Sequence, residues 1–402
     1  MLLLSDEEYA NRLELPELND RWFVVPEDTN EKDLTDLVKW VVSSRQQKTK
    51  NITGYTIFST TDCNARCFYC FELGRSRIPM SHEIALKTVQ YIKAHCGSEK
   101  VRISWFGGEP LFNQDAINTI CDGLRKENVE FRSTMVSNGY LFDGQTVRTA
   151  VEKWNLKRVQ ITLDGTEKVY NKAKAFIYKN VNAYEQVIAN VGLLLNAGVS
   201  VQIRLNMDLY NAENLLELVQ ELSARFPEQK GLRVYAHHIF DGDKPMAGMH
   251  TDDEWEKRDA AMQRLQETIV ACGLSGKSGI SKNLKMNHCM ADSGRSVTIL
   301  PDGHIGLCEH FSETEFAGDL ESESLDPKMV ASWKERIPQI PECDDCFYYP
   351  ECIKLRKCAS ASVCFRQLRQ DQLRKTKQQM KNEYEKWLNQ SSHDEEDEPI
   401  DC

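Results

Sequence analysis

Three cysteines within eight residues are the clearest chemical feature of this sequence. Cys63, Cys67 and Cys70 follow the pattern C-x3-C-x-aromatic-C, with Tyr69 as the aromatic residue. A loop this short can wrap three thiolates around an iron–sulfur cube, which leaves one iron without a protein ligand and available for chemistry. A structural zinc site is the alternative, although such sites usually close with four ligands.

A second group of cysteines lies between residues 289 and 364 of a chain that has 14 in all. Its members are Cys289, Cys308, Cys343, Cys346, Cys352, Cys358 and Cys364. Because cytoplasmic thiols stay reduced, this clustering favours metal ligation over disulfides. We expect Cys96, Cys121 and Cys272 to be small core residues and Cys402 to lie on the tail.

Composition narrows the class of protein. The 402 residues carry a formal net charge of −11, which argues against a nucleic-acid-binding surface, and 41% of them are hydrophobic, enough for a substantial core. No apolar run approaches the length of a membrane span, and residues 1–4 are too short for the core of a signal peptide. We therefore expect a cytoplasmic protein that neither binds nucleic acid nor enters a membrane.

Strand-like and helix-like segments alternate from residue 55 to about residue 238. The strand-like runs are 55–59, 101–106, 131–137, 158–163, 199–206 and 232–237. The helical patterns between them are 81–95, 115–126, 145–154, 183–197 and 211–226. Serial β/α units predict an α/β fold with a parallel sheet and outer helices, here a partial (β/α)6 TIM-like barrel. Chemistry in such folds lies at the carboxyl ends of the strands, and residues 63–70 follow the first strand.

The sequence suggests five segments. Residues 1–50 form an N-terminal cap or a reduced peptide-recognition segment, 51–240 the barrel, and 241–287 a helix (252–272) with a linker. Residues 288–364 form a small cysteine-rich domain with a β-hairpin, 296–300 and 304–308, that turns at Asp302-Gly303. So small a hairpin is expected to bury little core and to depend on metal. Residues 365–402 read as a charged helix followed by an acidic, disordered tail.

The first cysteine motif resembles that of the radical S-adenosylmethionine (radical SAM) superfamily. The resemblance implies that Cys63, Cys67 and Cys70 bind a [4Fe–4S] cluster whose fourth iron is chelated by SAM. Residues 107–110, Gly-Gly-Glu-Pro, match the family's GGEP motif, which holds the methionyl amino group. There Gly107 and Gly108 let the backbone approach closely, and Glu109, before Pro110, offsets the positive ammonium.

Other segments extend the resemblance along the barrel. Ser137 and Asn138 resemble the segment of the family that approaches the SAM ribose and carboxylate. Lys174 falls where many relatives carry an arginine that can pair with the SAM carboxylate, although lysine offers a point charge in place of a fork. The alternative is an ordinary surface lysine. Arg204 and Asn206 end the fifth strand and either face the site or are polar residues of the sheet edge.

The second cysteine group resembles the SPASM domain, which carries two auxiliary clusters in many peptide-modifying radical SAM enzymes. The resemblance assigns Cys343, Cys346, Cys352 and Cys364 to the distal cluster, and Cys289, Cys308 and Cys358 to the nearer one. Three [4Fe–4S] clusters result, the nearer auxiliary one with only three cysteines. Either His288, His310 or water completes it, or the assignment is shifted, or the site stays open for a substrate thiolate. A zinc-binding module is the alternative for the whole region.

The resemblance implies a radical SAM oxidoreductase that acts on a peptide, with SAM as cofactor and a reductant such as flavodoxin or ferredoxin as partner. The product we expect is an intrapeptide thioether, formed from a cysteine of a small ribosomally made precursor. An anaerobic enzyme that matures sulfatases by making formylglycine is the nearest alternative. Carbon–carbon crosslinking and epimerisation of a peptide are further outcomes, and a metal-stabilised binding module is the alternative without catalysis.

Overall fold

The structure of the chain is a computed structural model. The structure describes residues 29–47, 51–179, 181–227, 230–239, 252–275, 289–310, 315–322 and 324–343, together with residues 346, 349, 352, 355–358, 373, 376 and 377. Predictions for residues 1–28, 241–251 and 276–288, for Cys364 and Cys402, and for nearly all of the C-terminal helix and acidic tail lie outside these residues. Among the described residues, no helix is long and apolar enough to cross a membrane.

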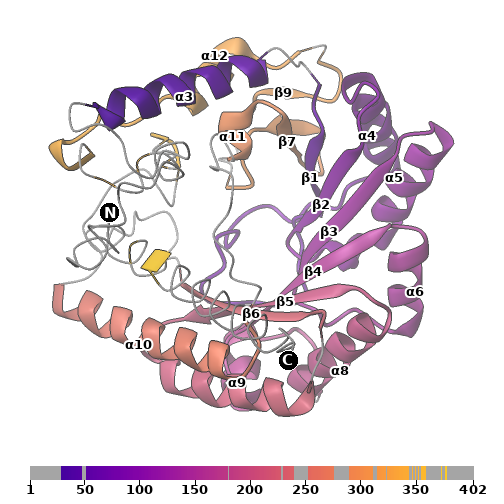
Figure 1. Cartoon of the computed structure of the whole chain (residues 1–402). Coiled ribbons are helices and arrows are strands. Elements are labelled where there is room, and N and C mark those ends of the chain that lie inside the picture. Colours follow the sequence, from indigo (N-terminus) through magenta and orange to yellow (C-terminus); the bar gives the residue numbers. More distant parts are fainter. Residues whose placement is uncertain are drawn as a thin grey trace, which may run out of the picture.

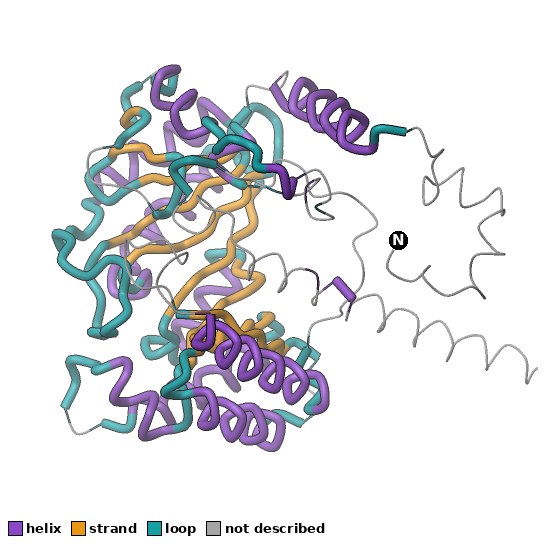
Figure 2. Tube along the Cα trace, turned by 90° about the vertical axis from the view of Figure 1, so that its left-hand side faces the viewer, coloured by secondary structure: helices purple, strands orange, loops and turns teal. Residues whose placement is uncertain are grey.

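One sheet of nine strands organises the molecule, in the order β6-β5-β4-β3-β2-β1-β7-β8-β9. Its first six strands along the chain are parallel: β1 (Gly54–Thr60), β2 (Val101–Gly107), β3 (Phe131–Ser137), β4 (Leu156–Leu163), β5 (Ser200–Met207) and β6 (Leu232–His238). These confirm the six predicted strands, with ends that differ by at most two residues. The strands curve together as one layer (Figure 2), as an α/β barrel that is not closed requires.

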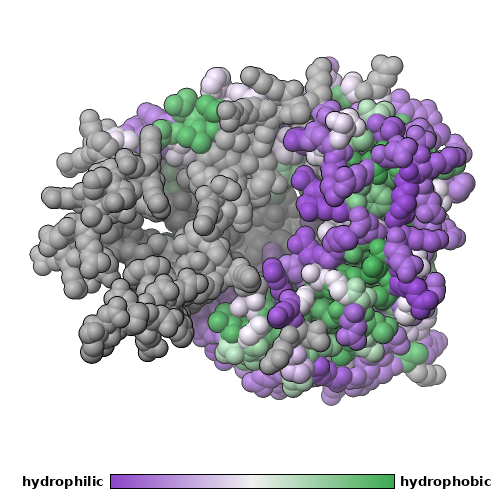
Figure 3. Space-filling model, turned by 45° about the vertical axis from the view of Figure 1, so that its right-hand side comes forward, coloured by the Kyte–Doolittle hydropathy of each residue, from purple (hydrophilic) through white to green (hydrophobic). Residues whose placement is uncertain are grey.

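Helices cover the outer side of this curved sheet (Figure 1). They are α4 (His82–His95), α5 (Gln114–Lys126), α6 (Gly144–Glu152), α8 (Ala183–Asn196) and α9 (Ala212–Arg225), each within two residues of its predicted ends. Ser81 caps α4 by accepting a hydrogen bond from the Ile84 N–H at 3.2 Å. The outward surface of these helices is mainly hydrophilic (Figure 3), because their apolar side chains face the sheet.

Alternation along each strand separates the core from the inner face of the barrel. On β2, Val101, Ile103 and Trp105 are buried under the helices. Arg102 and Ser104 alternate with them and point to the inner face, which we call the lumen. Cys96 and Cys121 are buried in the core as predicted, and Cys272 packs against it.

The predicted hairpin is present but is not a separate small sheet. Strand β7 (Ser296–Ile299) pairs in parallel with β1, and β8 (His304–Gly306) and the short β9 (Gly318–Asp319) continue the same sheet. Its apolar side chains, among them Val297, Ile299 and Ile305, are buried in the main core. The expectation that the hairpin buries little core was therefore wrong, because the open edge of β1 provides a partner far away in the sequence.

The remaining elements lie around this frame. Helix α10 (Asp252–Ala271) packs on α9 and β6. Helices α7 (Glu167–Lys174), α11 (Met290–Ser293) and α12 (Pro327–Lys334), and the 3-10 turns η1 (Pro110–Asn113) and η2 (Pro341–Cys343), were not predicted. Helix α3 (Glu31–Gln47) extends five residues beyond the amphipathic pattern.

Candidate functional site

The three cysteines of the first motif line a cavity of about 420 Å³ at the carboxyl ends of the parallel strands. Its wall includes Cys63, Cys67 and Cys70, and these thiols are close enough for each of the other two to raise the pKa of Cys63. Burial is the main cause and raises that pKa to about 12. Gly107 and Gly108 also line the cavity, as do Ser137, Asn138, Lys174 and Arg204. These residues, which the sequence analysis singled out in separate segments, therefore line one cavity.

Two glycines let the cysteine loop lie directly on the end of β2. Gly107 has a φ of +106°, and a Cβ there would come within 2.2 Å of the Thr60 carbonyl oxygen. A Cβ on Gly108 would come within 2.1 Å of the carbonyl oxygen of Asp62. The Gly108 and Glu109 N–H groups donate to the carbonyls of Thr60 and Asp62 at 3.1 and 2.9 Å. Both glycines are therefore needed for the cysteine loop to pack against the end of β2, and the approach of this segment to SAM stays a prediction.

Glu109 is fully buried and ties the end of β2 to the end of β3. Its carboxylate accepts hydrogen bonds from the Asn138 N–H at 2.7 Å, the Leu111 N–H at 3.1 Å and the Ser137 hydroxyl at 2.9 Å. Burial raises the pKa of Glu109 to about 7, against these hydrogen bonds. Its side chain does not line the cavity, so the arrangement makes Glu109 a positioning residue for Ser137 and Asn138. Pro110, at the start of η1, is buried behind it.

Tyr69, Asp164 and Lys174 form a buried polar cluster at the base of the cysteine loop. The Tyr69 hydroxyl donates to Asp164 at 2.7 Å, and the Lys174 ammonium donates to that hydroxyl at 2.8 Å. Lys174 Nζ lies 3.2 Å from Asp164 Oδ2, and the exposed fractions of these side chains are 4% and 0%. Burial opposes the charge on Lys174, but Asp164 and Tyr69 keep its pKa well above the ordinary value. Lys174 is therefore not an ordinary surface lysine.

Polar side chains from neighbouring strands complete the wall. Arg204 and Asn206 both line the cavity, and the Arg204 Nε–H donates to the Asn206 amide oxygen at 3.0 Å, so β5 has the register in which they face the site. The Asn138 amide donates to Asn64 Oδ1 in the cysteine loop at 2.6 Å. Asp164 was not predicted as a site residue, although its position at the end of the fourth strand is the signal that could have identified it.

The described cysteines of the second group lie in two parts of the structure, and their assignment to two clusters stays a prediction. Cys289, Cys308 and Cys358 pack against the same core. Burial raises the pKa of Cys308 to about 12, and Cys289 and Cys358 add to this shift. Cys343, Cys346 and Cys352 follow one another in a separate stretch, in which the Cys346 N–H donates to the Cys343 carbonyl at 3.3 Å.

Helix α3 contacts this second stretch through Tyr349. The Tyr349 hydroxyl donates to Asp36 at 2.8 Å, and the Lys39 ammonium donates to the Tyr349 carbonyl at 2.6 Å. The N-terminal helix thus meets the distal cysteine stretch, between Cys346 and Cys352.

His310 brings the second cysteine region to the first. Its ring lies 4.6 Å from that of Phe71, one residue after Cys70, and both His310 and Glu309 line the cavity. The His310 N–H donates to the Cys308 sulfur at 3.4 Å. The wall of the cavity is therefore built from both cysteine regions, and spacing alone could not show this.

The described cysteines form no disulfide bonds. In the described part of the chain, no three His, Cys, Asp or Glu side chains form a group that could hold one metal ion. Iron–sulfur ligation of the two cysteine groups stays a prediction here, with zinc as the alternative.

The family comparison agrees with this geometry. Residues 57–222 match the family model of the Radical SAM superfamily. The chain contains a radical SAM domain. Such a domain implies SAM and a [4Fe–4S] cluster, and the matched segment includes Cys63, Cys67 and Cys70.

Curated relatives match the radical SAM domain only in part. The "Probable GTP 3',8-cyclase" of Methanococcus maripaludis is 29% identical over 127 residues, which are 31% of this chain and 40% of that protein. The protein of the same name from Methanosarcina mazei is 28% identical over 178 residues, 42% of this chain and 49% of that protein. The chain thus spans less than half the length of either relative.

Solved structures match a larger share of the chain. "Native anSMEcpe with bound AdoMet" superposes with a TM-score of 0.60 at 15% identity, over 84% of this chain and 99% of that one. SuiB of Streptococcus suis bound to precursor peptide SuiA superposes with a TM-score of 0.56 at 15% identity, over 86% of this chain and 83% of that one. Because these identities are low, the likeness shows the fold alone. It covers more of the chain than residues 57–222, which match the family model.

Proposed function

We propose that this chain is a peptide maturase of the radical SAM type, which forms a thioether from a cysteine of a ribosomally made precursor peptide. One observation carries the proposal. The cavity lined by Cys63, Cys67 and Cys70 is completed by Glu309 and His310, which directly follow Cys308 of the second cysteine group. A carbon radical and a metal-bound sulfur have to meet in one place to make a carbon–sulfur bond, and this cavity adjoins both cysteine regions.

The residues around the cavity suit the cofactors that such a domain implies. Cys63, Cys67 and Cys70 would hold three irons of the [4Fe–4S] cluster, and Gly107, Gly108, Ser137 and Asn138 would flank SAM. When bound, the cluster and SAM supply the radical that removes a hydrogen atom from the peptide. Tyr69 fixes the cysteine loop through its hydrogen bonds to Asp164 and Lys174.

Lys174 and Arg204 provide positive charge on the wall where a carboxylate would bind. Lys174 Nζ has three N–H donors, of which Tyr69 and Asp164 engage two, so one remains for a ligand carboxylate. Arg204, held at 3.0 Å by Asn206, points a guanidinium into the same cavity. The binding of a ligand carboxylate by Lys174 and Arg204 is part of the proposal.

The substrate sulfur would bind beside Cys289, Cys308 and Cys358, with Cys343, Cys346, Cys352 and Cys364 holding the other auxiliary cluster. Three cysteines leave the nearer cluster a position for one more ligand, and a metal-bound thiol loses its proton. The overall change removes one hydrogen from a peptide carbon and one from the thiol, so the product is lighter by two hydrogens. SAM would be the oxidant: it would be cleaved to methionine and 5′-deoxyadenosine, which keeps the hydrogen atom from the carbon, while the thiol proton goes to solvent. The one electron that the external reductant supplies for this cleavage would be returned when the carbon–sulfur bond forms.

Two solved neighbours favour a peptide over a nucleotide substrate. One is native anSMEcpe with bound AdoMet and Cp18Cys peptide, and the other is SuiB with precursor peptide SuiA. Both cover more than four-fifths of this chain, whereas the GTP 3',8-cyclase relatives match less than half of it. Formylglycine formation remains the second candidate, since anSMEcpe superposes over 85% of this chain.

The test uses a short cysteine-bearing peptide encoded beside the gene, incubated anaerobically with reconstituted enzyme, SAM and dithionite. The proposal predicts a product lighter by two hydrogens whose cysteine resists alkylation. A product that still alkylates but has a carbon–carbon bond, or one that has lost sulfur and reacts with a hydrazine, would reject thioether formation. A parallel reaction with GTP should leave the nucleotide unchanged, and turnover of GTP but not of the peptide would overturn the peptide assignment.

A further inference from the structure

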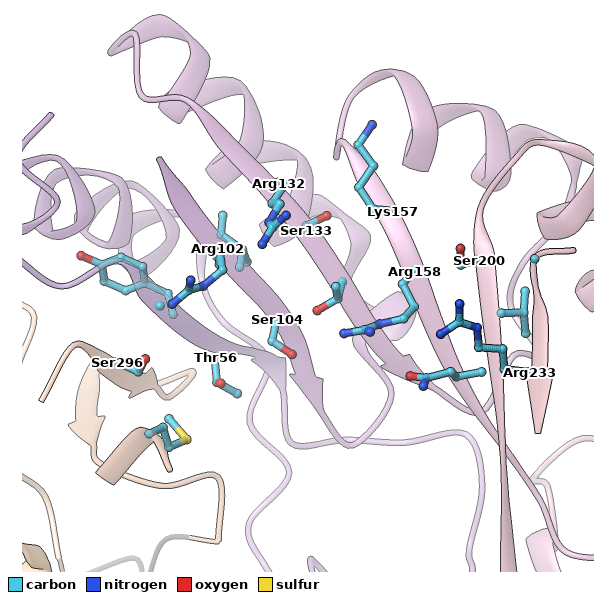
Figure 4. Close-up of a pocket in the computed structure, with 18 residues that line it drawn as sticks. Thr56, Arg102, Ser104, Arg132, Ser133, Lys157, Arg158, Ser200, Arg233 and Ser296 are labelled. Atoms are coloured by element: carbon cyan, nitrogen blue, oxygen red, sulfur yellow. The ribbon is translucent and has the colours of Figure 1, made fainter. Parts of the chain in front are cut away.

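A second and larger cavity, of about 520 Å³, lies at the opposite end of the strands from the cysteines. Arg102, Arg132, Arg158 and Arg233 line it from β2, β3, β4 and β6. Figure 4 shows these four side chains on one face of the sheet, whereas Lys157 points away from them. No aspartate or glutamate belongs to the lining, as far as the chain is described.

Strand register places two of these positive charges, those of Arg102 and Arg132, directly side by side. Arg102 pairs directly with Arg132, Arg158 lies beside Thr134, two residues further along β3, and Arg233 lies beside Gln202. Neighbouring strands are only about 4.8 Å apart, and like charges at such positions are destabilising. The chain carries a net charge of −11, so a cavity lined by four guanidinium groups is a region of positive potential on a negatively charged protein.

These charges are not neutralised by the protein around them. Among the described residues, none of the four arginines makes an ion pair or a side-chain hydrogen bond. Arg102 contributes only in the last place to the lowered pKa of the Glu99 carboxyl, which is due mainly to the hydrogen bond from Arg295. A repulsion that folding leaves uncompensated is what an anionic ligand would relieve.

Hydroxyl and amide groups lie between the arginines. Ser104 and Thr134 line the cavity two residues further along β2 and β3 than Arg102 and Arg132, and Gln202 lies beside Arg233. A single carboxylate is satisfied by one guanidinium fork, but a phosphate presents oxygens in three directions and can bind several forks and hydroxyls at once. Arg102 and Arg132, on neighbouring strands, could each bind one of two linked phosphates. The volume of the cavity is that of a small-molecule site.

The geometry points to a binding site for a small molecule that carries two or more phosphate groups, held by Arg102, Arg132, Arg158 and Arg233 at the amino-terminal end of the barrel. Thr56 and Ser104 line both this cavity and the one that contains the cysteines. The two cavities therefore meet across a polar layer of the lumen, in which the Tyr235 hydroxyl donates to Gln160 at 2.7 Å. The site is independent of the proposed peptide reaction.

Isothermal titration of the full, cluster-loaded chain with inorganic pyrophosphate at constant ionic strength tests the site. We expect one saturable site, with affinity reduced about 10-fold or more in Arg102→Ala and in Arg132→Ala, since each loses a charge-assisted contact. Arg132→Lys should fall in between, because it keeps the charge and loses the fork. Arg148→Ala, on the exposed face of α6, is the matched control and should bind as the wild type does.

Melting temperature separates a binding role from a structural one. Without ligand at low salt, Arg102→Ala and Arg132→Ala should melt no lower than the wild type, and pyrophosphate should raise the melting temperature of the wild type alone. Cluster absorbance recorded in the same samples checks that pyrophosphate does not extract iron. The proposal is overturned if pyrophosphate shows no saturable binding up to millimolar concentration, or if both variants bind it as tightly as the wild type. It is also overturned if the variants are less stable than the wild type without ligand, or if an oligoglutamate peptide binds and pyrophosphate does not.

Discussion

Replacing Lys174 tests whether the cysteine loop is held by a buried ion pair. In Lys174→Met, the carboxylate of Asp164 stays fully buried and keeps only the Tyr69 hydroxyl, 2.7 Å away, from this cluster. Removing one partner of a buried pair costs about 3–5 kcal/mol, because the other charge is left uncompensated. Asp164→Leu should cost a similar amount, since it leaves the Lys174 ammonium without its counter-charge.

The double variant Lys174→Met/Asp164→Leu removes both charges and should recover much of this loss. The two single costs should therefore exceed the double cost by about 3 kcal/mol. The midpoint of the first urea transition, measured anaerobically on the cluster-free chain, reports these differences. Lys168→Met, on the exposed face of the same helix α7, is the control and should stay within about 0.5 kcal/mol of the wild type.

The result that would refute this reasoning is a Lys174→Met chain as stable as the Lys168→Met control in the absence of SAM, with additive single and double effects. Lys174 would then serve a ligand and not the fold. A large loss of stability without ligand instead identifies it first as an anchor of the cysteine loop.

Three further predictions follow from the site. In Gly108→Ala the free energy of unfolding, measured with urea, should fall by about 1–3 kcal/mol and iron should be lost, because the new Cβ would meet the carbonyl oxygen of Asp62 at 2.1 Å. Gly144→Ala is the control and should lose neither stability nor iron, because the space around Gly144 is open. Equal behaviour of the two variants would be inconsistent with this packing. Burial raises the pKa of Glu109 from 4.5 to about 7, so between these pH values the native state binds a proton that the unfolded state has lost. The free energy of unfolding of the wild type should therefore fall by up to about 3 kcal/mol, relative to that of Glu109→Gln, as the pH rises from 4.5 to 7. A difference between the two proteins that does not change with pH would exclude this titration. Cys308→Ala should lower the iron content while 5′-deoxyadenosine still forms, and unchanged iron would remove Cys308 from the ligands.

The sequence predicted the parallel strands and outer helices because both depend on local periodicity. Residues 101–106 and 115–126 each show their buried face by alternation or by a helical repeat, and both are found within a residue of those bounds. The pairing of β7 with β1 joins residues more than 200 positions apart and leaves no local pattern. The hairpin could therefore be predicted, but not the sheet that it joins.

The site shows the same limit. Cysteine and GGEP spacing identified which segments matter, because their residue types are rare and closely spaced. The side-chain direction of Glu109 could not be predicted, since it depends on donors at residues 137 and 138 of another strand. The contact between Phe71 and His310, and the arginines gathered by register at the other end of the lumen, likewise depend on tertiary placement.

The central claim is that the cysteine loop at the end of β1 is a source of SAM-derived radicals. The most direct test is the amount of 5′-deoxyadenosine that the anaerobically reconstituted enzyme forms from SAM and dithionite. The wild type should form it, and variants with alanine at Cys63, Cys67 or Cys70 should form none although they remain folded. Formation of 5′-deoxyadenosine by the triple variant at the wild-type rate, or none by a wild type with full iron content, would contradict the account.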